Sequence, residues 1–248
     1  MFLSKLRALL NVLEFKSAVK AIIGWPKFSM ASFLIITRLI RAGVLPKTVI
    51  DVGANVGQFA VAASRLFDGA HIFSIEPDPT TAEVLRENTK GESGIVISVV
   101  ALGESVGEAK FFVNRDSQVS SLLQLGDDRV RAFPESTVER ELNVQLSTLD
   151  ALFGDRGLEK PILVKIDVQG FEDRVIRGGQ KFLSQVDWIL IEVSFAELYQ
   201  GELDFQGILR LLKENGFEFL RPMNFHTSPL TGEIIEMDAL FRRVGSIE

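Results

Sequence analysis

The chain has 248 residues, 46% of them hydrophobic and 24% charged, and it contains no cysteine. This composition is typical of a globular protein with one large domain, and it excludes disulfides, thiolate metal sites and cysteine nucleophiles. The formal net charge is −6, although residues 1–47 carry eight Lys or Arg and a single acid. Because phosphate contacts need clustered bases, the acidic remainder argues against nucleic acid as the main partner. The lack of cysteine also fits a reducing compartment, so we expect a cytoplasmic protein.

Residues 1–45 are predicted to form a basic extension of one or two amphipathic helices, ahead of a main domain at residues 46–248. This extension does not resemble a signal peptide, because its early apolar run is interrupted by an asparagine and a glutamate. The stretch FSMASFLIITRLIRAG carries Arg38 and Arg41, which leave too few uncharged residues to cross a bilayer. We expect the helices to pack on the domain or on a second subunit, with peripheral membrane contact as the alternative.

From about residue 46, short apolar runs alternate with amphipathic stretches. The first expected elements are strands at 48–53, 70–77 and 94–103 and helices at 57–67 and 78–90. Asp78 is the expected N-cap of the second of these helices, with Pro79 in its first turn. Apolar strands that alternate with helices predict a parallel sheet that is covered on both faces.

The middle of the chain, roughly residues 104–150, breaks this alternation. The runs 108–115 and 142–149 read as strands of a local antiparallel addition. Between them, residues 116–136 are polar and long, and we interpret them as a functional or mobile loop that could close over a substrate.

The alternation resumes at residue 160. The expected strands are 160–170, 186–194, 217–222 and 237–244, and the expected helices are 171–183 and 205–216. Gly178 and Gly179 mark the end of a helix within the first of these helical stretches.

The segment VIDVGANVGQF places Asp51 at the end of the first strand, followed by Gly53 and Gly57. Ligands of parallel sheets bind beyond the carboxyl ends of the strands, and glycines there let the backbone approach the ligand. The glycine spacing is not the G-x-G-x-x-G of dinucleotide-binding proteins, and Asp51 lies where a phosphate would have to be. An acid at this place favours a cationic or zwitterionic ligand such as S-adenosylmethionine (SAM), and Asn55 offers amide contacts.

Glu76 ends the second strand and is followed by a proline. A carboxylate in this position can accept hydrogen bonds from both hydroxyls of a ribose. Taken singly, Asp51 can equally be a turn aspartate and Glu76 a solvated strand end. Together, on consecutive strand ends with the glycines between them, they favour an adenosine-containing ligand.

The motifs VIDVGANVGQFA, IFSIEPDP, VVALGE, ILVKIDVQGFE, WILIEVS and DALFRR resemble those of the FkbM-like methyltransferases, a family of class I SAM-dependent enzymes, over about residues 49–243. The resemblance implies a Rossmann-like α/β fold, with a doubly wound seven-stranded sheet that is mostly parallel and has an antiparallel last strand. It also implies O-methylation of a sugar or secondary metabolite. The residues it assigns to the cofactor are Asp51, Gly53, Asn55 and Gly57 around the methionine part, Glu76 on the ribose, and the VVALGE segment with Ala101 near the adenine.

Three acids, Asp167, Glu172 and Glu192, lie near the ends of the later strands. Methyl transfer to a hydroxyl needs help in removing its proton, from a general base or a divalent metal, and any two of these acids could share such an ion. Asp167 is the first candidate for this role. Glu172 equally fits the first turn of a helix, where carboxylates are favoured. Glu192 lies in an apolar strand, where an unpaired charge is costly, so we expect a functional role for it.

Three further residues are candidates for the site. His226, expected in the loop before the last strand, is a possible base ranked below Asp167, because histidine titrates near neutral pH. Lys165 lies two positions before Asp167 on the same strand face, and fits a structural ion pair with Asp167 or Glu192 better than the alternative role of orienting the substrate. Tyr199 fits either the acceptor pocket or ordinary helix packing.

The leading hypothesis is therefore a SAM-dependent O-methyltransferase with a small hydroxylated acceptor such as a sugar, glycan or secondary metabolite. Two alternatives stay open. One is a scaffold protein that binds the cofactor without turnover, and the other is a nicotinamide-dependent oxidoreductase, which the glycine spacing disfavours.

Overall fold

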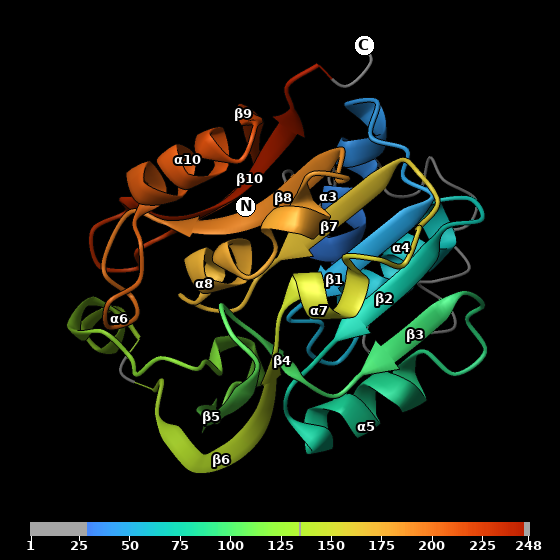
Figure 1. Ribbon diagram of the computed structural model, residues 1–248. Coiled ribbons are helices and arrows are strands. Elements are labelled where there is room, and N and C mark those ends of the chain that lie inside the picture. The colour runs from blue at the N-terminus through green and yellow to red at the C-terminus, as the bar shows by residue number, and fades with distance from the viewer. Residues whose placement is uncertain (1–28, 134, 246–248) are drawn as a thin grey trace.

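The computed structural model describes residues 29–133 and 135–245. Within them, a seven-stranded sheet runs through the centre of the molecule (Figure 1). Its strands are β1 (Thr48–Val52), β2 (His71–Ile75), β3 (Ile95–Ser98), β7 (Ile162–Ile166), β8 (Trp188–Ser194), β9 (Phe217–Thr227) and β10 (Ile234–Arg243). Their order is β3-β2-β1-β7-β8-β10-β9, and β10 is antiparallel to both of its neighbours. The predicted mostly parallel sheet with an antiparallel last strand is confirmed.

Helices cover both faces of this sheet, and two apolar clusters form the core. On one face lie α3 (Met30–Arg41) and α4 (Gln58–Leu66), and on the other lie α7 (Leu149–Phe153), α8 (Glu172–Arg177), α9 (Gln180–Leu183) and α10 (Phe205–Glu214) (Figure 1). Residues along each strand alternate between the faces, so Val49 joins the α3 and α4 cluster while Ile50 joins the other. The sheet is therefore doubly wound, as the alternation of strands and helices predicts.

Of the predicted N-terminal extension, the structure describes the part that contains α3; residues 1–28 lie outside the described residues. Phe33, Ile36 and Leu39 of α3 are fully buried in the same cluster as Phe59 and Ala63 of α4. This helix therefore packs on the main domain, as expected. The division of the chain at residue 45 stays a prediction. No helix of the described residues is long and apolar enough to span a bilayer.

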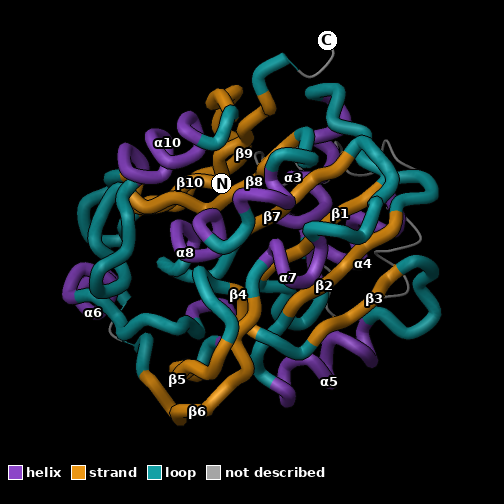
Figure 2. The backbone as a smooth tube through the Cα atoms, in the orientation of Figure 1, coloured by secondary structure: helices purple, strands orange, loops and turns teal. Residues whose placement is uncertain are grey.

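The middle of the chain forms a second, smaller sheet outside the main one (Figure 2). Its strands are β4 (Ala101–Leu102), β5 (Gly107–Asn114) and β6 (Val138–Ser147), and the predicted antiparallel pairing is that of β5 with β6. The prediction of one strand over 94–103 is wrong, because the chain leaves the main sheet after Ser98 and its next two strand residues pair with β6. The loop between β5 and β6 contains the short helices η1 (Ser117–Val119) and α6 (Asp127–Ala132).

Three other predicted boundaries also have structural outcomes. α5 (Pro79–Asn88) begins as expected, with the Asp78 side chain accepting a hydrogen bond from the Thr80 backbone. The predicted helix 171–183 is interrupted between α8 and α9 at Gly178, where a Cβ atom would lie 2.0 Å from the carbonyl oxygen of Gly103. β9 is longer than predicted and includes His226, which pairs with Glu236 of β10. The placement of His226 in a loop is therefore wrong.

Candidate functional site

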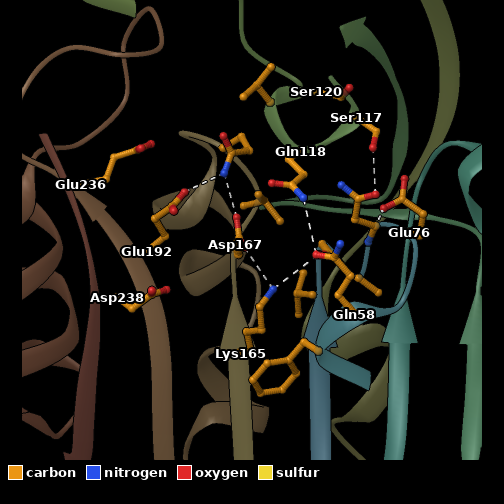
Figure 3. A pocket seen from close by; sticks show the side chains of 18 of the residues that line it. Gln58, Glu76, Ser117, Gln118, Ser120, Lys165, Asp167, Glu192, Glu236 and Asp238 are labelled. Carbon is orange, nitrogen blue, oxygen red and sulfur yellow. Dashed lines mark hydrogen bonds and ion pairs between the residues drawn. The ribbon is translucent and has the colours of Figure 1, made fainter. Parts of the chain in front are cut away.

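A cavity of about 920 Å³ lies at the carboxyl ends of the parallel strands. Of the predicted site residues, those that line it are Gly53, Asn55, Glu76, Ala101, Asp167, Glu192 and His226. Asp51 and Gly57 lie behind the lining, and Asp51 is fully buried. Figure 3 shows Glu76 at one end of the cavity, Glu192, Glu236 and Asp238 at the other, and Asp167 and Lys165 between them. The structure therefore brings together residues from the ends of β1, β2, β7 and β8 with residues of β4, β9 and β10.

The strand pattern explains why so many charged groups meet here. On β7, Leu163 lies in the apolar cluster beneath α3 and α4, and Lys165 follows on the same face two residues nearer the carboxyl end. The same step leads from Val49 to Asp51 on β1 and from Leu190 to Glu192 on β8. Each strand thus changes from apolar to charged as it reaches the cavity.

Lys165 of β7 is ion-paired with Asp51 of β1 and with Asp167, which follows β7. Its Nζ lies 3.4 Å from Oδ1 of Asp51 and 3.3 Å from Oδ2 of Asp167. The pair with Asp167 is one of the two that the sequence allowed, while Asp51 takes the place proposed for Glu192. Although burial alone would lower the pKa of Lys165, the two carboxylates raise it above its usual value. Lys165 therefore stays charged.

Asp51 is poorly compensated for a fully buried acid. Within the described part of the chain, neither of its carboxylate oxygens has a hydrogen-bond partner. Burial raises the pKa of Asp51, and the charge of Lys165 opposes this shift. Burying a carboxylate in this way is costly, so the fold alone does not explain why the residue is an aspartate.

The glycine turn after β1 is packed tightly against the residue that follows β7 and against α5. Gly53 has a φ of +77°, and a Cβ atom there would lie 1.8 Å from the carbonyl oxygen of Asp167. Gly57 has a φ of +87°, and a Cβ atom there would lie 2.4 Å from a methyl carbon of Leu85. Both positions therefore require glycine, and the backbone of the turn is held at the cavity wall.

Glu76 is fixed by two backbone amides. One carboxylate oxygen accepts a hydrogen bond from the N–H of Asn55 and the other from the N–H of Asp78, each at 3.0 Å. Burial nevertheless raises the pKa of Glu76 to about 7. The oxygens are thus held in place and keep lone pairs for a ligand.

The far end of the cavity is rich in acids from β8 and β10. Burial raises the pKa of Glu192 well above its ordinary value, that of Glu236 to about 7, and that of Asp238. Arg129 of α6 pairs with Glu236 at 3.5 Å. Buried Nε of Arg129 has no hydrogen-bond partner among the described residues.

The polar loop between β5 and β6 lines part of the cavity, and its interpretation as a functional loop stays a prediction. Ser117 donates a hydrogen bond to Oδ1 of Asn55 at 3.0 Å, and Gln118 reaches Gln58 at 3.5 Å (Figure 3). Arg129 also comes from this loop and lines the opposite end of the cavity. The loop therefore contacts both ends of the site.

The remaining candidates from the sequence lie outside the cavity or at its rim. Glu172 does not line the cavity. Its carboxylate accepts a hydrogen bond from the N–H of Val168 at 3.0 Å in the first turn of α8, which agrees with the expected place in a helix start. Tyr199 is fully buried and outside the lining, so it does not form an acceptor pocket directly. His226 is exposed at the cavity rim, with its Nε2 3.5 Å from the amide nitrogen of Asn224. In the part of the chain described, no three acidic or histidine side chains are arranged to hold a metal ion.

Several lining residues were not predicted from the sequence, among them Arg129, Gln169, Glu236 and Asp238. Gln169 joins Asp167 to Glu192 through its side-chain amide, and Arg129 pairs with Glu236. The signal for Gln169 was present in the motif VKIDVQGFE, as a polar residue between a strand end and a glycine. Arg129 lies in a segment without a periodic pattern, so its partner could not be predicted from the sequence.

The raised pKa values predict an unusual pH dependence of stability. In the folded protein, burial raises the pKa of Glu76 and Glu236 to about 7 and that of Glu172 to about 8, from ordinary values of 4.5. Between pH 4.5 and these raised values, the carboxyls of the folded chain hold protons that the unfolded chain has released. The free energy of unfolding therefore rises as the pH falls through this window. We expect the ligand-free protein to melt at a higher temperature at about pH 6 than at about pH 8.5.

Differential scanning calorimetry over this pH range measures the effect. Replacement of Glu172 by Gln should make the melting temperature less dependent on pH. Replacement of exposed Glu104 by Gln is the matched control and should leave the dependence unchanged. A melting temperature of the parent that falls on acidification from about pH 8.5 to about pH 6 would contradict the prediction.

Comparison with known proteins gives consistent findings. The sequence model described as "Methyltransferase FkbM domain" matches residues 51–219. The 2-O-methyltransferase NoeI of Sinorhizobium fredii is 29% identical over 170 residues, which cover 66% of this chain and 70% of that protein. The hexuronic acid methyltransferase AglP of Haloferax volcanii is 28% identical over 165 residues, which cover 66% of this chain and 60% of that protein, less than two thirds of its length.

A solved structure supports the fold. The N-terminal domain of EvdMO1, crystallised in the presence of SAH and D-fucose, superposes with a TM-score of 0.51 at 9% sequence identity. The superposition covers 87% of this chain and 84% of that one.

Proposed function

Because the chain belongs to the methyltransferase FkbM domain family and is a SAM-dependent methyltransferase, we propose that it transfers the methyl group to a hydroxyl of a small acceptor, such as a sugar, a glycan or a secondary metabolite. The observation that carries the proposal is a pair of cavity-lining carboxylates, Asp167 and Glu192, which Gln169 bridges and of which Asp167 adjoins the glycine turn. The names of two relatives support the proposal, because NoeI is a 2-O-methyltransferase and AglP a hexuronic acid methyltransferase.

The end of the cavity formed by β1 and β2 fits the cofactor. We assign the turn Gly53–Gly57, with Asn55, to the methionine part, Glu76 to the ribose hydroxyls, and the segment around Ala101 to the adenine. Asp51 is suited to a cationic ligand, because its buried carboxylate has one cation, Lys165, and no hydrogen bond in the described residues. When bound, SAM supplies a methyl group that its sulfonium has already activated.

The acids at the other end suit a hydroxylated acceptor. Carboxylates accept hydrogen bonds from sugar hydroxyls, and Arg129 offers a buried N–H to an oxygen. The protein must hold the acceptor hydroxyl in line with the methyl group, exclude water and receive the proton. Asp167 is the candidate for the last task, since its side chain is 33% exposed and lies between the two ends of the cavity. Glu192 lies next to it as a second proton-binding group.

The two alternatives make different demands on the same cavity. A nicotinamide cofactor would bring its pyrophosphate to the glycine turn that follows Asp51, and the carboxylate of Asp51 would repel the phosphates. A scaffold protein would need the cofactor end only. The acids at the acceptor end would then be an unexplained cost, because Glu236 is buried and Glu192 and Asp238 are half-buried.

A methyl-transfer assay tests the proposal. The protein is incubated with SAM and a panel of monosaccharides, uronic acids, oligosaccharides and hydroxylated metabolites, and the products are analysed by mass spectrometry. The proposal predicts an acceptor that gains the mass of one methyl group, with the methyl on oxygen. Methylation of a nitrogen or carbon acceptor in preference to every hydroxyl would contradict it, and SAM binding without transfer to any acceptor would favour the scaffold.

A further inference from the structure

Gln169 has a backbone conformation that is rare for its residue type. Its φ is +59°, in the left-handed region, and Gly170 follows at +94°. Such a conformation is strained for a residue with a side chain and persists where the surroundings hold it. Gln169 is also largely buried and lines the cavity. The strain is therefore located at the site itself, two residues after Asp167.

The side-chain amide of Gln169 contacts both candidate carboxylates. Its Nε2 donates to Oδ1 of Asp167 at 2.8 Å and to Oε2 of Glu192 at 2.6 Å, which are drawn as dashed lines in Figure 3. An amide nitrogen has two hydrogens, so each carboxylate can receive one of them. Because Asp167 is on the end of β7 and Glu192 on β8, the amide fixes the distance between two strand ends.

Tyr199 determines which end of the amide faces the acids. Its buried hydroxyl donates to Oε1 of Gln169 at 2.5 Å, so the amide oxygen is held on the side away from the carboxylates. The tyrosine itself is held against Gly170, where a Cβ atom would lie 2.6 Å from the Cβ of Tyr199. Ser121 of the loop donates to the Gln169 carbonyl at 2.6 Å. Gln169 is thus fixed at its backbone and at both ends of its amide.

We propose that Gln169 is a positioning residue that holds Asp167 and Glu192 at one separation beside the acceptor, and that the Tyr199 hydroxyl orients the Gln169 amide for this task. The effect on methyl transfer rests on the proposed function, whereas the bridged geometry rests on the contacts of Gln169 alone. It assigns Tyr199 a role although this residue does not reach the cavity.

The geometry is tested by NMR of side-chain amides, without turnover. The Gln169→Met variant, which lacks the amide, identifies the Gln169 signal in the parent spectrum. Protons that donate to carboxylates resonate downfield, so the parent signal should lie downfield of the other Gln side chains. In Tyr199→Phe it should move toward their range, because the amide is free to turn. An unchanged signal in Tyr199→Phe, or an unshifted one in the parent, would overturn the proposal.

Kinetics test the consequence. With an acceptor from the methyl-transfer assay, Tyr199→Phe should reduce kcat about tenfold and leave the KM for SAM unchanged, as expected when one neutral hydrogen bond is lost. A shifted amide signal with unchanged kcat would overturn the positioning role. If the parent methylates no acceptor, the proposed function fails, and the amide signal still decides whether the two acids are bridged.

The matched control is Thr37→Val. Thr37 is also buried, and its hydroxyl donates to the carbonyl of Phe33 within α3, outside the cavity lining. This variant loses a buried hydroxyl as Tyr199→Phe does. It should leave the Gln169 signal and kcat unchanged, which separates orientation of the amide from a general loss of stability.

Discussion

Replacement of Asp167 by Asn is expected to lower kcat for methyl transfer by about 10²- to 10⁴-fold, the range for loss of a general base. The side chain keeps its size, but its single acceptor oxygen can accept from Lys165 or from Gln169 and not from both, and the amide cannot accept the hydroxyl proton. Binding of SAM should change little, because the glycine turn meets the Asp167 backbone carbonyl, which the substitution retains. Steady-state kinetics with the acceptor, together with calorimetric titration of SAM, measure both effects.

Asp173→Asn is the matched control for this experiment. Asp173, like Asp167, is an acid in an ion pair, with Arg174 at 2.6 Å, but it is buried and does not line the cavity. Its substitution should leave kcat near the parent value. If Asp167→Asn retains parental kcat, Asp167 is not the base, and Glu192→Gln is then the variant to examine.

Replacement of Asp51 by Asn is expected to weaken SAM binding roughly 100-fold. The attraction between a buried carboxylate and a cationic ligand is worth about 3 kcal/mol at an effective dielectric constant of about 20, and this corresponds to about two powers of ten in Kd. Melting of the ligand-free protein should stay unchanged or move to higher temperature. The reason is that the buried carboxylate has no hydrogen-bond partner in the described residues, and its loss still leaves Lys165 paired with Asp167.

Calorimetric titration with SAM and thermal melting without ligand check the two parts of this prediction. A large drop in melting temperature would assign Asp51 to the fold. Equal affinities of Asp51→Asn and the parent would remove it from the cofactor site.

Much of the fold could be predicted because its signals are local. The first two strands and the helices that follow them are defined by apolar runs, glycines and the Asp78–Pro79 cap, and the structure confirms them. The departure of the chain from the main sheet after Ser98 could not be predicted, because it depends on pairing with β6, some 45 residues later. His226 was misplaced for the same reason, since β9 is extended by its pairing with β10.

For the site, the sequence could identify the strand ends but not their partners. Asp51 and Lys165 are ion-paired because β1 and β7 are neighbouring strands in which these two residues are in register. The order of strands in a sheet cannot be predicted from the sequence of a single strand. Gln169 and Tyr199 are 30 residues apart and meet through the turn after β7. Predicting their contact would require the left-handed conformation of Gln169, which propensity alone disfavours.

A side-by-side calorimetric titration of the parent protein and the Asp51→Asn variant with SAM and with NADH tests the cofactor assignment most directly. If the cavity end formed by β1 and β2 binds a positively charged methyl donor, the parent binds SAM, the variant binds it roughly 100-fold more weakly, and neither binds NADH. Binding of NADH by the parent, with no heat of binding for SAM, would contradict this assignment.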